Sequence, residues 1–129
     1  MTIAYWCVLA GCLLPLVAIG FAKFLSSDSD PKNYDNNAPR NYLAKLTGNG
    51  QRALWAEKNT LESLPLFIAA VIIAHQTGVE QVTLDILAIS FVGFRLLYIY
   101  LYISDKATLR SMSWGAALTC CIAMFVLAV

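Results

Sequence analysis

Three polar residues stand at helical spacing inside an apolar stretch in the second half of the chain. Arg95, Tyr98 and Tyr102 occupy positions i, i+3 and i+7, which places one cation and two phenols on a single helical face. An arginine at the centre of a hydrocarbon layer costs about 2.5 kcal/mol or more, so Arg95 requires a partner or a water-filled cavity. We interpret the three residues as candidates for binding a polar ligand, while helix packing alone is the simpler explanation of the two tyrosines.

A second polar stripe lies earlier in the chain and is formed by Arg52, Trp55, Asn59 and Glu62. Spacings of three, four and three residues again place the side chains on one face of a helix. Buried groups of this kind must satisfy one another or a ligand, and Arg95 is the expected partner of Glu62 from the facing helix. The alternative is that Glu62 and Arg95 form an interhelical ion pair that only holds the helices together.

Arg110 and Ser111 are predicted to open the last helix of the chain. An arginine beside a hydroxyl and the free backbone N–H groups of a helix N-terminus can stabilise an anion such as a thiolate or a carboxylate. An arginine at this place also fits a simpler pattern, in which basic residues gather at one membrane surface. The pair becomes a catalytic candidate in combination with the two polar stripes.

The other residues that could carry chemistry do not form a recognisable site. His75 is the only histidine and stands in a polar turn, so the sequence predicts neither a metal site nor a catalytic triad. No glycine-rich phosphate loop is present. Neither pair of nearby cysteines has the geometry of a disulfide within itself, and we expect all four to be packing residues. They are Cys7, Cys12, Cys120 and Cys121.

The composition indicates that the elements carrying these residues lie in a membrane. Of the 129 residues, 59% are hydrophobic and 13% are charged, against a usual charged share of about 25% in soluble domains. The mean hydropathy is +0.64. Nine Lys and Arg oppose eight Asp and Glu without a basic block, which excludes the electrostatic footprint of nucleic-acid binding. The length leaves room for one domain, with the lipid bilayer as its solvent.

Apolar runs predict an all-α integral membrane four-helix bundle that forms a single domain over residues 1–129. The first run is interpreted as a retained helix, because no basic residue precedes Lys23 as a signal peptide would require. The long polar loop contains Asp, Asn and Pro turn signals. The spans are expected at about 3–24, 52–74, 82–104 and 110–128, and the loop at about 25–51.

The placement of basic residues predicts the orientation of a multi-pass membrane protein. Lys and Arg gather in or beside the loop 25–51 and beside the turn at residues 105–109. The turn that contains His75 and both ends of the chain carry none. By the positive-inside rule, the loop 25–51 lies in the cytoplasm and both termini lie outside, in the inner (plasma) membrane if the protein is bacterial.

With these residues assembled, the chain resembles the MAPEG family, the membrane-associated proteins in eicosanoid and glutathione metabolism. The segment 52–67, in which Asn59 and Glu62 precede a proline and a phenylalanine, is similar to the family's second-helix signature. Arg95 followed by Tyr102 is similar to its third-helix motif, and Arg110 with the serine after it resembles the start of its fourth helix. The resemblance covers nearly the whole chain and is nearest to the small bacterial members.

The resemblance implies a homotrimer of four-helix subunits that binds glutathione between neighbouring subunits near the cytoplasmic surface. Glutathione would be a co-substrate, and a lipid-facing cleft would admit an apolar electrophile or hydroperoxide, as in a transferase or peroxidase. Arg110, beside Ser111, would stabilise the thiolate, because a thiol becomes a useful nucleophile at neutral pH next to a cation. The tripeptide would be held by Asn59, Glu62, Arg95 and Tyr102, and the two polar stripes add Arg52 and Tyr98 as candidates.

Two alternatives remain open at the level of sequence. A small proton-coupled multidrug exporter also has four short spans and a membrane carboxylate, although Glu62 stands among polar neighbours rather than alone in a first helix. A noncatalytic membrane scaffold would keep the fold without the site. Trp55 is the main argument for the scaffold, because well-studied eukaryotic members of the family carry an arginine at the corresponding place.

Overall fold

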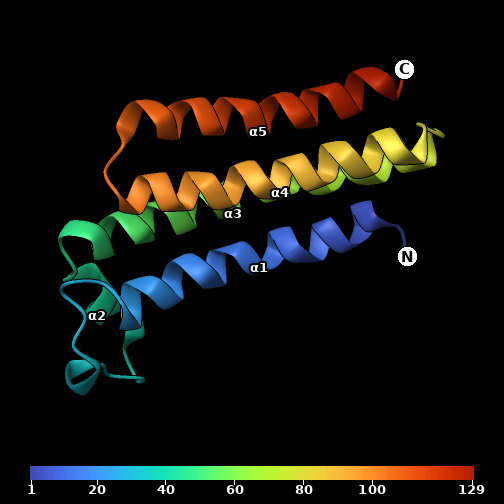
Figure 1. Ribbon diagram of the computed structural model, residues 1–129. Helices are drawn as coiled ribbons and strands as arrows, with labels where there is room; N and C mark the ends of the chain where they lie inside the picture. Colours follow the sequence, from blue (N-terminus) through green and yellow to red (C-terminus); the bar gives the residue numbers. More distant parts are fainter.

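The computed structural model describes residues 1–129 and is entirely helical (Figure 1). Four long helices run alongside one another, and a short one lies at the end where α1 leads into the polar segment. Both termini lie together at the opposite end. The elements are α1 (Ile3–Phe24), the 3₁₀ turn η1 (Pro31–Asn33), α2 (Pro39–Ala44), α3 (Gly48–Gln76), α4 (Gln81–Ile103) and α5 (Ala107–Leu127).

The long helices form a layered bundle in which α3 and α4 are central. Helix α1 packs on α3 and α4 from one side, and α5 packs on the same two helices from the other side (Figure 1). In the middle, the rings of Phe67 on α3 and Phe91 on α4 are stacked, with 3.8 Å between their centroids. Small residues surround this pair and let the helix backbones approach closely. They include Ala4, Ala70, Ala74, Ala88 and Ala117, all fully or almost fully buried.

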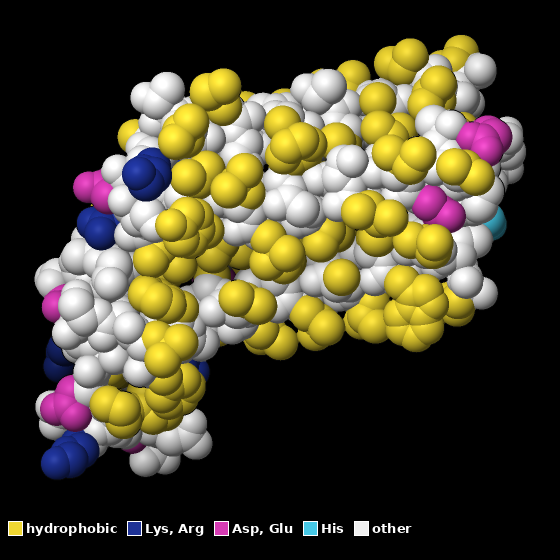
Figure 2. Space-filling model, viewed as in Figure 1, with side chains coloured by type: hydrophobic (Ala, Val, Ile, Leu, Met, Phe, Trp, Pro, Cys, Tyr) yellow, Lys and Arg dark blue, Asp and Glu magenta, His cyan; other side chains and the backbone are white.

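Three of the helices, α1, α4 and α5, are long and apolar enough to cross a membrane. Their outward faces carry exposed Leu, Ile and Val side chains. Hydrophobic side chains cover much of the face of the molecule that Figure 2 shows. Helix α3 has 29 residues, but its first half also carries two Glu, one Lys and one Arg, so only its second half is uniformly apolar. A surface of this kind is compatible with a lipid environment, and the chain is a membrane protein.

Side-chain hydrogen bonds tie the polar segment before α3 into a fixed shape. Ser27 donates to Asn49 from both its backbone N–H and its hydroxyl, at 3.0 Å each. Thr47 donates to Asp28 from its N–H at 2.9 Å and also from its hydroxyl. These two bonds lower the pKa of Asp28, because the ionised carboxylate is the form that accepts them. The segment is therefore held against the start of α3 by its own polar side chains.

Two helix starts differ from the boundaries expected from sequence. Helix α3 begins at Gly48, four residues before the expected start at 52. Residues 48–51 were assigned to the loop because they are polar or glycine, but they form the first turn of the helix. Helix α5 begins at Ala107, three residues before the expected start at 110. The α4–α5 turn is shorter than expected, because Asp105 adopts a left-handed conformation with φ of 59° and Lys106 donates its N–H to Leu101 O at 2.9 Å.

Candidate functional site

The predicted polar residues of α3 and α4 meet around a buried guanidinium. Arg95 is 1% exposed and donates to Asn59 Oδ1 from Nη1 and Nη2, at 3.1 Å each. Its Nη2 also donates to the hydroxyl of Thr60 at 2.8 Å. The Nε of Arg95 is buried and has no hydrogen-bond partner. The Arg95 charge is thus solvated by neutral oxygens, with one donor left unsatisfied.

The expected pairing of Glu62 with Arg95 does not form in the structure. The donors of Arg95 are directed to Asn59 and Thr60, which stand three and two residues before Glu62 on α3. The carboxylate of Glu62 is exposed instead. The prediction of this contact was wrong. Residues on one face of α3 lie at different heights along α4, and Arg95 lies level with Asn59 and Thr60 instead of Glu62. The carboxylate of Glu62 is therefore accessible to a ligand.

The rings of two tyrosines connect Arg95 to the start of α5 through direct contacts. The Arg95 guanidinium lies over the ring of Tyr98 at 4.2 Å, and the Arg110 guanidinium lies over the ring of Tyr102 at 4.3 Å. The two tyrosines touch edge to face, with 5.6 Å between their centroids. Such cation–π contacts hold a guanidinium in place without neutralising it. The face predicted on α4 thus joins both arginines in one array.

The site opens to the outside through two adjoining hollows that share Asn59, Tyr98 and Tyr102. The first, here called the open hollow, has a volume of about 480 Å³ and is lined also by Trp55, Lys58 and Glu62. The second, here called the Arg110 hollow, has a volume of about 210 Å³ and is lined also by Arg110, Ser111 and Trp114. One carboxylate and two cations therefore face a continuous surface beside α3, α4 and α5.

A third space, here called the inner cavity, extends from Asn59 into the apolar part of the bundle. It has a volume of about 230 Å³ and lies between α3, α4 and α5. One side is polar, with Asn59, Glu62, Ser63 and Arg95, and the rest is apolar. The apolar lining consists of Leu66, Phe91, Trp114, Ala117, Leu118 and Cys121. An apolar molecule with one polar group matches this lining.

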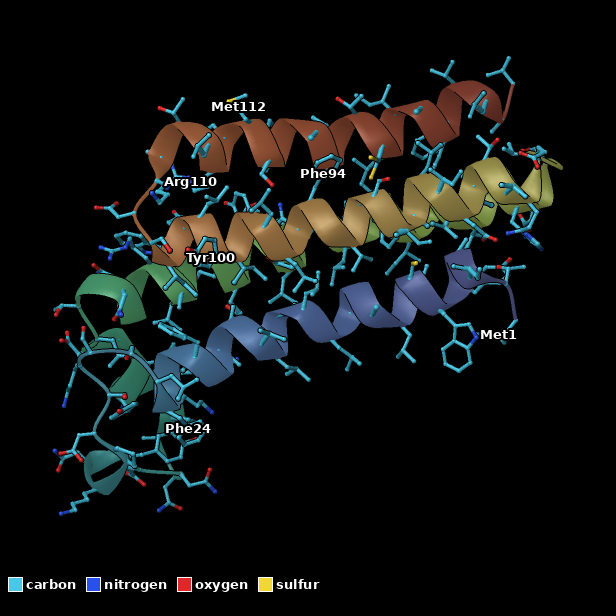
Figure 3. All side chains as sticks on the ribbon, viewed as in Figure 1. Met1, Phe24, Phe94, Tyr100, Arg110 and Met112 are labelled. Carbon is cyan, nitrogen blue, oxygen red and sulfur yellow. The ribbon has the colours of Figure 1, made fainter.

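Arg110 and Ser111 lie in the site, but not at the first residue of a helix as expected. The backbone N–H of Arg110 donates to Lys106 O at 2.9 Å, and the Ser111 hydroxyl donates to Ala107 O at 3.1 Å. The predicted free backbone N–H groups beside Ser111 are therefore absent, because α5 begins one turn earlier. What Arg110 offers is its guanidinium, which reaches Tyr102 on the neighbouring helix. Figure 3 shows Arg110 on the first turns of α5, beside the end of α4 that carries Tyr100.

Arg52 is the predicted site residue that the structure separates from the others. Its Nε donates to the backbone oxygen of Ile103 at 3.2 Å, the last residue of α4. A cation at this place satisfies one of the free carbonyl groups at a helix C-terminus and opposes the negative end of the helix dipole. Arg52 lines neither hollow nor the inner cavity. The contact that Arg52 forms in the structure is with the end of α4.

Nine residues of the site were not predicted from the sequence. They are Lys58, Thr60, Ser63, Leu66, Phe91, Trp114, Ala117, Leu118 and Cys121. Trp114 and Cys121 stand four and eleven residues after Arg110, so the helical spacing from Arg110 could have found them. Lys58 follows Trp55 by three residues and carries the same signal. Thr60 lies beside the predicted stripe rather than on it, and no pattern in the sequence distinguishes it from a packing threonine.

Comparison with protein-family profiles matches the MAPEG family over residues 3–129, essentially the whole chain. No curated protein and no solved structure shows significant similarity to it. The family match agrees with the helical fold, the three membrane-capable helices and the gathering of the resembling motif residues Asn59, Glu62, Arg95, Tyr102 and Arg110 around the hollows. The chain belongs to the MAPEG family.

Proposed function

We propose that this protein is a membrane-bound glutathione-dependent transferase or peroxidase that acts on apolar electrophiles or hydroperoxides. The observation that carries the proposal is the meeting of three spaces at Asn59, two with charged or polar lining and one mostly apolar. Such a junction can bring a charged thiol and an apolar second substrate together. Membership of the MAPEG family supports a glutathione-related activity.

The charges around the open hollow are complementary to those of glutathione. Glu62 is an exposed carboxylate that can accept from the ammonium group of the tripeptide, and Lys58 supplies positive charge near its carboxylates. Asn59 uses its Oδ1 for Arg95, so its amide N–H₂ remains free to donate to a peptide oxygen. Tyr98 and Tyr102 each place a phenol ring on the lining of both hollows. The residues present therefore fit the tripeptide.

Arg110 is the residue best placed to activate a thiol. A free thiol has a pKa of about 8.5, and a neighbouring cation stabilises the thiolate. Arg110 lines the Arg110 hollow, and Trp114 lines both this hollow and the inner cavity. Ser111 can donate to the same sulfur once its hydroxyl turns away from Ala107 O. Glutathione supplies the nucleophilic sulfur, and the chain supplies the charge and the position.

The second substrate is proposed to enter the inner cavity with its polar group toward Asn59 and its apolar part against Phe91 and Leu118. Apolar lining with a few convergent polar groups is typical of small-molecule sites. The exporter alternative is less well supported, because Glu62 shares its hollow with Lys58 and Asn59 instead of standing alone in apolar surroundings. Proton release from the purified protein on addition of a drug would favour the exporter. A scaffold without activity would bind no thiol.

We also propose that residues 1–129 form one domain with four membrane spans, and that three copies assemble with glutathione between neighbours. In support, α3 packs along α1, α4 and α5, and the open hollow leaves Glu62 facing outward. All Lys and Arg except Arg95 lie at the end of the bundle that carries α2, which favours a cytoplasmic loop and external termini. The mass of the detergent-solubilised protein, from light scattering, tests the trimer.

Calorimetric titration of the purified protein with glutathione, together with the thiolate absorbance difference, tests the proposed site. We expect saturable binding and a thiolate signal for the wild type. Arg110→Ala should lose about tenfold or more of the thiolate signal at pH 7, since a shift of one pKa unit changes the thiolate fraction by about that factor. Lys106→Ala removes a cation from the same turn and should keep the signal. Absence of binding at millimolar glutathione would contradict the proposal.

A further inference from the structure

A separate hollow lies on the other side of α3, where the short helix α2 covers the ends of α1 and α3. It has a volume of about 440 Å³, and we call it the α2 hollow. It receives side chains from all three helices. An apolar wall is formed by Ile19, Leu43 and Leu54, and the charged part of the lining is formed by Arg40, Glu57 and Lys58. The proposed thiol site does not account for this combination.

The α2 hollow lies where the apolar surface of the bundle meets the polar segment. Helix α1 ends at Phe24, and Phe24 and Leu25 are 56% and 73% exposed just past the wall residue Ile19. Exposed apolar side chains next to basic ones mark the level at which a protein leaves a bilayer. In Figure 2, hydrophobic and Lys or Arg side chains lie next to one another at this end of the molecule. A ligand of the α2 hollow would thus lie at the depth of lipid headgroups.

The three charged side chains of the α2 hollow form no hydrogen bond or ion pair within the chain. Arg40 and Lys58 are exposed and Glu57 is half-buried. Two cations and one carboxylate leave a net charge of +1 beside an apolar wall. This pattern is complementary to a group that carries one negative charge, one positive charge and an attached hydrocarbon chain. Basic hollows between membrane helices are known to hold phospholipid headgroups.

We propose that the α2 hollow binds a membrane phospholipid whose headgroup is a phosphodiester with a primary ammonium group, as in phosphatidylethanolamine. Arg40 donates to the phosphate, with Lys58 adding positive charge from the border of the open hollow. Glu57 accepts from the ammonium N–H groups, and the acyl chains begin against Ile19, Leu43 and Leu54. Phosphatidylcholine carries the same charges but has no N–H donor for Glu57. The site therefore distinguishes the two lipids.

Native mass spectrometry of the full-length protein in detergent, titrated with each lipid of matched acyl chains, measures this preference. We expect phosphatidylethanolamine to bind about tenfold more tightly than phosphatidylcholine, the effect of one charge-assisted hydrogen-bonding contact. Glu57→Gln should remove the preference. Arg40→Gln should weaken both lipids about tenfold, and Arg40→Lys should restore part of the binding. Lys32→Gln, in the turn η1, removes a matched charge outside the α2 hollow and should change neither affinity.

Equal affinity for the two lipids in the wild type would overturn the proposal, as would unchanged binding in Arg40→Gln. Glycerophosphoethanolamine has the same headgroup without acyl chains and separates the two sources of this chemistry. If it displaces the lipid at equal concentration, the α2 hollow recognises a soluble phosphodiester and the lipid assignment is wrong. Glutathione affinity, measured in parallel, reports on the thiol site independently, so failure of one proposal does not imply failure of the other.

Discussion

Arg95 and Asn59 form the central contact of the site, since both terminal nitrogens of the Arg95 guanidinium converge on the single Oδ1 of Asn59 at 3.1 Å. The contact joins α4 to α3 in the interior of the bundle, with Thr60 as the further acceptor. It holds a charge that is almost fully buried, on the lining of the inner cavity. The same amide therefore supports the fold and faces all three spaces of the proposed site.

Replacing Asn59 should destabilise the bundle as well as impair binding. Asn59→Leu leaves the buried Arg95 with Thr60 as its only oxygen acceptor, and a hydrogen bond to a charged group contributes about 1.5–3 kcal/mol. We expect a decrease of that size in the free energy of unfolding in detergent, measured by denaturant titration. Asn37→Ala, an exposed change in the polar loop, is the control and should be neutral. Equal stability of Asn59→Leu and wild type would contradict the role of the contact.

Arg52 should matter for stability and not for glutathione. In Arg52→Gln the helix C-terminus at Ile103 loses a cation, an effect of about 0.3–1 kcal/mol. We expect a correspondingly lower unfolding free energy with an unchanged glutathione dissociation constant by calorimetry. Lys32→Gln, in the turn η1, removes a cation whose side chain forms no hydrogen bond and controls for the change in net charge. A tenfold loss of glutathione affinity in Arg52→Gln alone would return Arg52 to the binding site.

Filling the inner cavity should weaken binding of the apolar substrate, with a loss of about 1–3 kcal/mol in stability because Ala117 is also packed in the core between the helices. Ala117 is 2% exposed and lines this cavity, so Ala117→Leu takes up space that the second substrate requires. Steady-state kinetics should show at least about a tenfold higher KM for an apolar electrophile, the lower end of the range for a methylene-scale change in an apolar pocket, with unchanged glutathione affinity. Ala116→Leu places the same side chain at a neighbouring position that does not line the inner cavity. If the two variants behave alike, the apolar substrate binds elsewhere.

Gly50 should not tolerate a larger side chain. A Cβ at this position would lie 2.8 Å from Ser26 Oγ and 3.0 Å from Ser26 Cβ, and the hydrogen bond of Ser26 to Ala22 O keeps that serine in place. We expect Gly50→Ala to cost about 1–3 kcal/mol of unfolding free energy, the range for overpacking. Gly20→Ala meets no atom within 4 Å and should be neutral or slightly stabilising. Combining Gly50→Ala with Ser26→Gly should recover most of the loss.

The family and the helical fold were predictable because both depend on local pattern. Apolar runs and charge placement indicate membrane helices, and the family resemblance carried by Asn59, Glu62, Arg95 and Arg110 is confirmed by the family match. The helical spacing also predicted that Arg95, Tyr98 and Tyr102 share a face, and all three contribute to the site. A face depends only on the helical repeat of the chain.

Contacts between helices were decided by the tertiary structure. The sequence determined that a buried arginine needs a partner, but the relative shift of α3 and α4 selected Asn59 and Thr60 and left Glu62 exposed. The position of the α4 C-terminus likewise made Arg52 a helix cap instead of a site residue. The relative position of two helices along their axes depends on how the whole helices pack, as in the stacked rings of Phe67 and Phe91. The spacing of residues within one helix does not encode this position.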